Sequence, residues 1–215
     1  MEIIYKRDLS TNVFMAELVY AVNNKVKMLQ MESCSQGWKI NLELPDGEYP
    51  YKFILNNGIR INDPEAYKYS HWLNGETWSV LKVVNGEIQK SGYASTELNN
   101  FYVHNGKTLL YPRDRACHIS FDLNDVRGIH SITALWYQPD GSLYHIEEAT
   151  VDAPDNASYK FKESFWIDLN QDTHPFSYGI WMVEIFVDGD KKVREFFNVF
   201  GGSNVRNIGI YNYAL

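Results

Sequence analysis

The stretch that decides the fold runs from Trp38 to Gly58 and reads Trp38-Lys-Ile-Asn-Leu-Glu-Leu-Pro-Asp-Gly-Glu-Tyr-Pro-Tyr-Lys-Phe-Ile-Leu-Asn-Asn-Gly58. Apolar and polar residues alternate from Ile40 to Leu44 and again from Tyr49 to Phe53, which is the pattern of half-buried strands. Pro45-Asp46-Gly47 is typical of a tight turn, because proline fixes φ and glycine accepts a positive φ. Asn56-Asn57-Gly58 turns the chain again. The stretch therefore predicts a meander of antiparallel strands and fits no helix.

The chain on either side of this stretch continues the pattern. Residues 13–22 read as a strand that ends at Asn23-Asn24, and residues 77–83 read as a closing strand that is broken at Asn85-Gly86. Residues 27–32 also alternate, but Met28 and Met31 are out of phase with a period of two. This mismatch predicts a bulge or bend.

The second half repeats the same pattern of short strands and turns. Strands are predicted at residues 117–123, 132–137, 143–146, 165–169, 179–187 and 192–200. Pro139-Asp140-Gly141 and Asp188-Gly189 each predict a hairpin turn. Short strands with a turn signal every ~8–12 residues are typical of β-sandwiches. The predicted fold is all-β, with two immunoglobulin-like antiparallel sandwiches in tandem, at residues 1–88 and 89–215. The apolar residues 208–215 are expected to add a strand, on this chain or on a neighbour.

Composition and charge narrow the class of protein. Aromatic residues make up 15% of the chain, which suits sheets with a substantial core. The formal net charge is −7, with acids and bases mixed, so nucleic acid is not an expected partner. No apolar run is long enough to cross a membrane, and the first residues lack the apolar segment of a signal peptide. The two cysteines, Cys34 and Cys117, are expected to stay unpaired in a reducing compartment. The expected location is the cytoplasm, unless a signal was trimmed.

The Leu-Pro-Asp-Gly-Glu-Tyr-x-Tyr-Lys-Phe pattern from Leu44 to Phe53, followed by Asp63-Pro64, resembles the family 48 carbohydrate-binding module. Relatives include the glycogen-binding domain of the AMP-activated protein kinase β subunit. The similarity covers roughly residues 12–83. The Gly-x-Trp-x-Val-Glu-x-x-Val-Asp-Gly pattern from Gly179 to Gly189 is similar to the last strands of many bacterial immunoglobulin-like and fibronectin-like modules. The resemblance implies a glycogen-binding-like function for the first sandwich.

The family's sugar site consists of two tryptophans, a lysine and an asparagine. By resemblance, Lys52 matches the lysine, and Asn24 belongs to the Asn-Asn run before the first tryptophan. Lys25 stands where that tryptophan is expected, and Arg60 stands nearest the second tryptophan position. The polar residue before the last strand falls close to Trp78. Both platform tryptophans are therefore absent, and a satisfied surface charge is the favoured alternative interpretation of Lys52.

Other aromatic residues could replace the missing platform. Tyr67, Tyr69, Trp72 and Trp78 cluster in the sequence, and Trp72 lies in what reads as a polar loop. Trp72 is either a stacking face for a sugar, an anchor for a protein, or a cover over its own sandwich or the seam between domains. Trp38, Trp136 and Trp181 sit in alternating strands and are expected in the core. The predicted ligand-binding residues are Lys52, Arg60, Asn24, Tyr67, Trp72 and Trp78.

No motif for catalysis, a metal or a cofactor is present in the sequence. Glu147-Glu148 and Asp188 with Asp190 could act as acid and base, but a solvated strand end and a hairpin tip are the favoured interpretations. The sequence thus predicts a non-catalytic binding protein without cofactor or metal. Its expected partner is an oligo- or polysaccharide. The alternative is a structural or protein-interaction module that forms a homodimer or docks on another protein.

Overall fold

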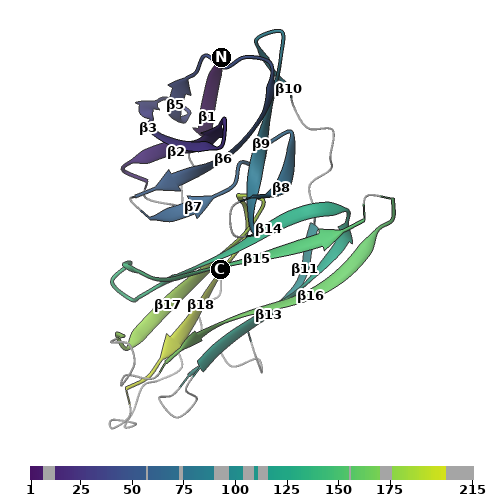
Figure 1. The fold of residues 1–215 in the computed structure, drawn as a ribbon. Coiled ribbons are helices and arrows are strands. Elements are labelled where there is room, and N and C mark those ends of the chain that lie inside the picture. The colour runs from purple at the N-terminus through teal and green to yellow at the C-terminus, as the bar shows by residue number, and fades with distance from the viewer. Residues whose placement is uncertain are drawn as a thin grey trace.

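The computed structural model describes residues 1–6, 13–56, 58–72, 75–89, 97–103, 109–110, 116–154, 156–169 and 176–201, with only the backbone considered in 97–103 and at 109. The described residues form antiparallel sheets in two sandwich-like units, one above the other in Figure 1. This confirms the all-β prediction. The predicted strand at 208–215 and most of the connection between the units lie outside the described residues. The described part contains no helix that could cross a membrane.

The first unit consists of two sheets. The strands of the smaller sheet, in spatial order, are β1 (Glu2–Lys6), β5 (Gly37–Asn41) and β4 (Glu32–Cys34). The path of the larger sheet is β10 (Glu87–Gln89), β9 (Glu76–Val84), β6 (Gly47–Leu55), β2 (Ala16–Val22) and β3 (Lys25–Gln30). Two further strands join it, β7 (Ile59–Ile61) on β6 and β8 (Lys68–Trp72) on β9.

The predicted meander is wrong in one respect. β5 pairs with β1 and β4, whereas β6 pairs with β2 and β9. Pro45-Asp46-Gly47 therefore carries the chain from one sheet to the other and does not close a hairpin. The predicted bend near Met31 is confirmed: Met31 is buried between β3 and β4, and its N–H donates to the Ala16 carbonyl over 2.9 Å. At this point the edge strand passes from the larger sheet to the smaller one.

The predicted hairpin turn at Asp188-Gly189 is present, and Asn23-Asn24, which was predicted only to end a strand, forms another. Asn23 and Asn24 have φ of 50° and 58°, and Asp188 and Gly189 have φ of 56° and 87°. Both are two-residue turns with two positive φ angles, the type I′ geometry that matches the twist of a hairpin. Asn85-Gly86 forms a third such turn, with φ of 53° and 76°.

The second unit also has two sheets. The smaller contains β11 (Glu97–Val103), β13 (Ala116–Val126) and β16 (Tyr159–Asp168). The larger, called sheet D here, contains β12 (Leu109–Leu110), β18 (Asp190–Val199), β17 (Gly179–Val187), β14 (Gly128–Tyr137) and β15 (Leu143–Ala153). Trp136 and Trp181 are buried between the two sheets, as predicted, whereas Trp38 is half-buried against the first core.

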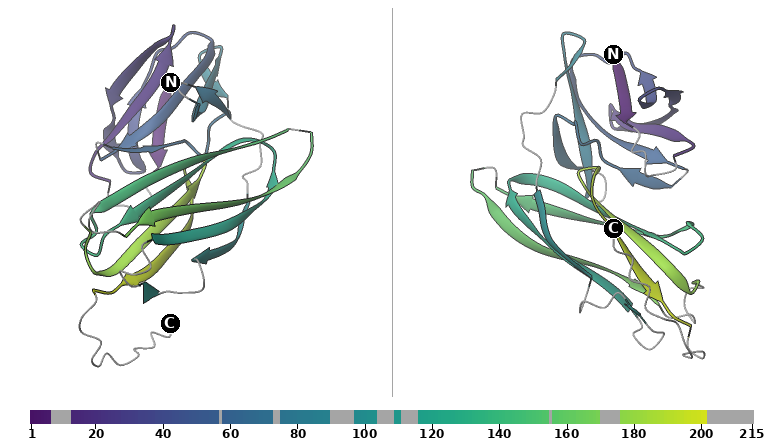
Figure 2. Two further views of the ribbon diagram at one scale, coloured as in Figure 1. Left: turned by 60° about the horizontal axis from the view of Figure 1, so that its bottom comes forward. Right: turned by 180° about the vertical axis from the view of Figure 1, so that it is seen from behind.

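Within sheet D, strand β14 is buried on both faces. Ile132, Ala134 and Trp136 of β14 belong to the second core. The alternate residues Leu135 and Tyr137 belong instead to the cluster of the first core, together with Phe186 of β17. One end of the first sandwich thus rests on the outer face of sheet D, as the two views in Figure 2 show. We call this contact the seam.

Candidate functional site

Lys52 is a seam residue. It lies on β6, and its side chain is 0% exposed. Its ammonium donates to both carboxylate oxygens of Glu148 on β15, each over 2.9 Å, and Glu148 is 23% exposed. The second sandwich therefore covers the face of β6 that carries Lys52. The prediction that Lys52 is a satisfied charge is confirmed by Glu148, but its predicted position at the surface is wrong, because the side chain is buried.

Four residues gather beside Lys52, and we call Arg60, Trp72, Glu76 and Trp78 the Glu76 cluster. The Glu76 carboxylate accepts from Arg60 over 3.4 Å and from the indole N–H of Trp78 over 3.3 Å. A further oxygen–nitrogen distance of 3.9 Å links it to Lys52. Trp72 is half-buried and meets buried Trp78 edge-on, with ring centroids 4.9 Å apart. An indole, a guanidinium and a carboxylate are thus brought together at the surface.

The structure joins four of the six predicted residues and leaves two apart. Lys52, Arg60, Trp72 and Trp78 meet around Glu76, as described above. Tyr67 instead pairs with Lys82, whose ammonium donates to the Tyr67 hydroxyl over 3.0 Å. Asn24 is exposed in the turn between β2 and β3.

Two acidic residues at the site were not predicted from the sequence, and one aromatic residue was placed wrongly. Glu76 and Glu148 were not predicted as site residues, although Glu76 alternates with Trp78 on β9 and so shares its face. The predicted polar loop around Trp72 is wrong, because Lys68–Trp72 forms β8 and Trp72 pairs with Glu76 on β9. Residues 68–72 form a strand because they pair with β9. No local pattern in the sequence predicts such a pairing.

The Asn62-Asp63-Pro64 loop is fixed by hydrogen bonds within the first sandwich and lies beside Gly189 of the second. The Asn62 side chain is buried, accepts from the Ser79 N–H over 2.9 Å and donates to the Thr77 carbonyl over 3.2 Å. Asp63 accepts from the Tyr51 hydroxyl over 2.7 Å. Burial raises the pKa of Asp63, and the hydrogen bond from Tyr51 acts in the opposite direction. These residues, part of the resemblance, therefore fix the loop that faces the second sandwich.

No protein-family model matches the chain. No curated protein matches it either. Solved structures give distant matches. The Pseudomonas fluorescens alkylpurine DNA glycosylase AlkC, bound to DNA containing an abasic site analogue, is 13% identical with a TM-score of 0.36, over 50% of this chain and 31% of that one.

Two other structures match most of this chain at lower TM-scores. A tetra-tandem repeat of a large adhesion protein is 12% identical with a TM-score of 0.25, over 87% of this chain and 41% of that one. A putative β-galactosidase from Bacteroides fragilis is 12% identical with a TM-score of 0.29, over 86% and 28%. The chain spans less than half of each of these proteins. The matches assign no family.

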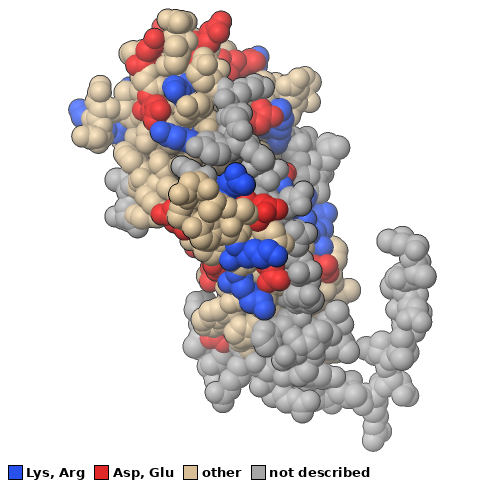
Figure 3. Space-filling model, turned by 90° about the vertical axis from the view of Figure 1, so that its right-hand side faces the viewer, with Lys and Arg blue, Asp and Glu red and all other residues tan. Residues whose placement is uncertain are grey.

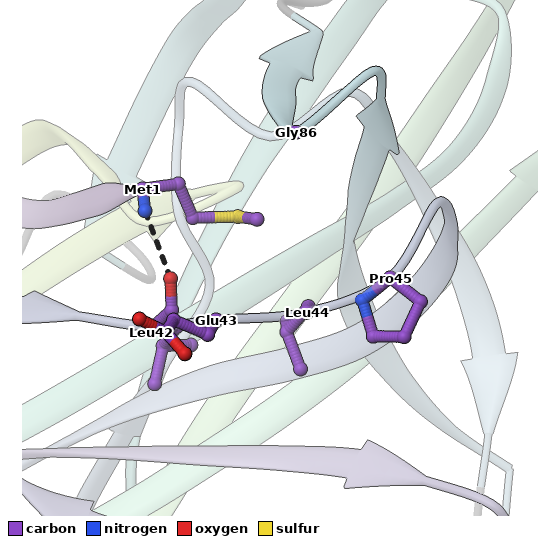
Figure 4. A pocket seen from close by; sticks show the side chains of 6 residues that line it. All are labelled: Met1, Leu42, Glu43, Leu44, Pro45 and Gly86. Carbon is purple, nitrogen blue, oxygen red and sulfur yellow. Dashed lines mark hydrogen bonds between the residues drawn. The ribbon is translucent and has the colours of Figure 1, made fainter.

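Two other surface features lie away from the Glu76 cluster. Trp166 on β16 is 51% exposed and stacks on His118, with ring centroids 6.1 Å apart. Its alternation with Lys162 and Ser164 could have placed it on a solvent face from the sequence. A shallow hollow of about 360 Å³ lies in the first sandwich (Figure 4), and none of the six predicted residues lines it. Acidic and basic side chains are interspersed on the face in Figure 3.

His130, Asp188 and Ser131 form a buried polar group on the second sandwich. His130 Nδ1 lies 2.6 Å from a carboxylate oxygen of Asp188, and Nε2 lies 2.8 Å from the Arg127 carbonyl oxygen. The Ser131 N–H donates to the other Asp188 oxygen over 2.9 Å. The sequence suggested that Asp188 lies at a solvated hairpin tip. This interpretation is wrong, because the Asp188 side chain is buried. Because Nε2 faces a carbonyl, this group lacks the serine–histidine contact of a catalytic triad.

The protonation of His130 makes stability depend on pH. Burial lowers the pKa of His130, but the hydrogen bond and charge of Asp188 and the Arg127 carbonyl outweigh it, so the pKa lies above the usual 6.5. Only the imidazolium can donate to both acceptors. Its stabilising contribution is complete below pH 6.5 and is lost as pH rises through the raised pKa. Tyr69, the facing group on β8, stays neutral in this range, because burial and Asp188 raise its pKa.

We expect His130→Gln to remove this pH dependence. The wild-type melting temperature should fall between pH 6 and pH 9 more than that of the variant, because glutamine carries no titrating proton. Thermal unfolding of both proteins at several pH values gives their melting temperatures as a function of pH. Parallel curves for the two proteins would contradict the assignment of an imidazolium.

Proposed function

We propose that this chain is a non-catalytic carbohydrate-binding protein that binds its ligand at the Glu76 cluster and not at the Lys52 face. The observation that carries the proposal is the meeting of Trp72, Arg60 and Glu76 at one place on the surface. The resemblance of residues 12–83 to the family 48 carbohydrate-binding module supports the choice of ligand, with an α-glucan as the first candidate.

The chemistry of the cluster fits a sugar. Proteins hold sugars on aromatic faces, which contact the C–H face of the ring, while a few polar groups fix the hydroxyls. Trp72 supplies an indole, and its edge-on contact with buried Trp78 fixes its position. Arg60 and Glu76 are 56% and 38% exposed and lie beside it, so a guanidinium and a carboxylate are available to sugar hydroxyls.

The Lys52 face is an unsuitable site for this ligand. Lys52 makes two 2.9 Å contacts to Glu148 and is fully buried at the seam. A sugar could reach its ammonium only if the sandwiches separated and left a buried ion pair broken.

Trp72→Ala is expected to lower the affinity for a bound α-glucan at least tenfold, which corresponds to about 1.4 kcal/mol. Affinity electrophoresis through glycogen and titration calorimetry with maltoheptaose measure it, and other glycans follow in an array. Trp166→Ala is the control, because it removes an exposed tryptophan from the other sandwich. No binding by the wild type across the array, or equal losses in both variants, would contradict the proposal.

A protein-interaction module is the second candidate, and the exposure of β3 favours it. All six residues of this edge strand are exposed. Under this alternative, the first sandwich keeps its fold, and its face with Lys52 serves as the contact with the second sandwich. Sizing chromatography with light scattering tests the homodimer form of this candidate, for which a mass of twice 25.0 kDa is expected.

A further inference from the structure

β3 is an open edge of the larger sheet in the first sandwich. It pairs with β2 on one side and ends the strand order on the other. Its apolar residues Val26, Met28 and Leu29 are 49%, 57% and 37% exposed. An edge strand presents unpaired N–H and C=O groups that can pair with another strand. Among the described residues, no strand pairs with the outer edge of β3, and its apolar side chains are exposed.

The hairpin turn fixes which backbone groups point outward. In a two-residue turn, the flanking residues Val22 and Lys25 form a hydrogen-bonded pair. Hydrogen-bonded and non-hydrogen-bonded pairs then alternate along an antiparallel ladder. Val26, Met28 and Gln30 are the alternate residues, so their N–H and C=O groups point to the open edge. Val26 and Met28 also lie on one face, next to the buried side chains of their partners on β2.

The other face of β3 carries two lysines and Leu29. Lys25 and Lys27 point to the face opposite Val26 and Met28, because side chains alternate along a strand. Both are exposed, and no ion pair to either occurs among the described residues. An incoming antiparallel strand would thus meet Val26 and Met28 on one face, and two lysines together with Leu29 on the other.

We propose that β3 is a docking edge for an extended segment of a partner protein in which apolar and acidic residues alternate. The segment adds a strand to the sheet, as in other cases of strand addition. Its apolar residues pack beside Val26 and Met28, and its acidic residues lie opposite Lys25 and Lys27. Cross-strand pairs of opposite charge stabilise such a ladder, whereas like charges destabilise it. This binding site is separate from the Glu76 cluster, so it stands or falls independently of the sugar proposal.

Charge also argues against a second copy of β3 as the occupant. The strand reads Lys-Val-Lys-Met-Leu-Gln from Lys25 to Gln30 and contains no acidic residue. Pairing of two such strands gives neither lysine a carboxylate partner. Lysines on edge strands oppose self-association. The same two lysines would then select an acidic partner strand.

A short synthetic peptide tests the proposal. Acetyl-Thr-Val-Val-Glu-Val-Glu-amide places valines opposite Leu29, Met28 and Val26 and glutamates opposite the two lysines. Its addition to the labelled protein is expected to shift the backbone amide signals of Val26, Met28 and Gln30 and to slow their hydrogen exchange. The same peptide with lysine in place of glutamate is expected to bind at least fivefold more weakly, and the difference should shrink at high salt.

Variants separate the edge from general effects. Met28→Pro removes an N–H that points away from β2, so it should abolish binding while the sheet stays intact. Lys27→Glu should reverse the preference between the two peptides, whereas Lys160→Glu, the same change on exposed β16, should not. Shifts at other edges, no shifts at millimolar peptide, equal binding of both peptides, or a dimer formed through β3 would each overturn the proposal. Glycogen binding by Met28→Pro should equal that of the wild type.

Discussion

Gly189→Ala is expected to destabilise the protein by about 2–5 kcal/mol, one of the two largest effects predicted here. Gly189 has a φ of 87°, and a left-handed conformation costs a non-glycine residue about 1–2 kcal/mol. A Cβ on Gly189 would also clash with the backbone carbonyl oxygen of Asn62 in the other sandwich. That backbone cannot yield easily, because the Asn62 side chain is bonded to Thr77 and Ser79. Overpacking of this kind costs a further ~1–3 kcal/mol.

Gly141→Ala is the matched control for Gly189. Gly141 has a φ of 81°, but no atom lies within 4 Å of the position that its Cβ would take. Its replacement should therefore cost only the backbone strain of about 1–2 kcal/mol. Urea unfolding followed by tryptophan fluorescence gives both values. If the free energy of unfolding falls by the same amount in both variants, Gly189 is not in close contact with Asn62 across the seam.

The turns were predictable because a few residues determine them locally. Asn23-Asn24, Asn85-Gly86 and Asp188-Gly189 all adopt two positive φ angles, and these residue types accept such angles at little cost. Strand positions followed in the same way from alternation, as in residues 179–187, which match β17. Which strands pair is a non-local matter. Pro45-Asp46-Gly47 looks like a hairpin turn, but it connects two sheets, because only the packed core decides where β5 goes.

The seam could have been foreseen in part. β14 reads Gly-Ile-His-Ser-Ile-Thr-Ala-Leu-Trp-Tyr, and its last eight residues are buried. A near-continuous apolar strand indicates burial on both faces, whereas a one-sided sandwich strand alternates. The sequence did not indicate what covers the second face. Lys52 and Glu148 are 96 residues apart, and no local pattern links them. Glu76 was missed for the same reason: its neighbours Arg60 and Trp72 lie on separate strands, and no local pattern links them to it.

The contacts across the seam couple the two sandwiches. Leu135, Tyr137 and Phe186 of the second sandwich belong to the core cluster of the first. Lys52 joins the same contact with an ion pair. The sandwiches are therefore expected to unfold in one transition. The Glu76 cluster borders this contact through Lys52, so a ligand that binds there should also stabilise the seam.

Glu148→Gln is expected to destabilise the protein by about 3–5 kcal/mol, because it leaves the ammonium of Lys52 buried without its carboxylate partner. Glu76, at 3.9 Å, is too distant to replace both hydrogen bonds. Lys52→Met should cost less, because Glu148 is 23% exposed and its carboxylate can be hydrated. The double variant should be more stable than the sum of the single losses indicates, since it removes both charges.

Glu48→Gln is the control for the single and double variants of Lys52 and Glu148. Glu48 pairs with Lys68 over 2.7 Å, but the two side chains are 44% and 39% exposed. An exposed pair of this kind contributes about 0–1 kcal/mol, so the variant should unfold close to the wild type. Calorimetry should show one transition for the wild type and two for Glu148→Gln if the lost pair uncouples the sandwiches. A loss below about 1 kcal/mol in Glu148→Gln would mean that water reaches Lys52 and that its face is open to a ligand after all.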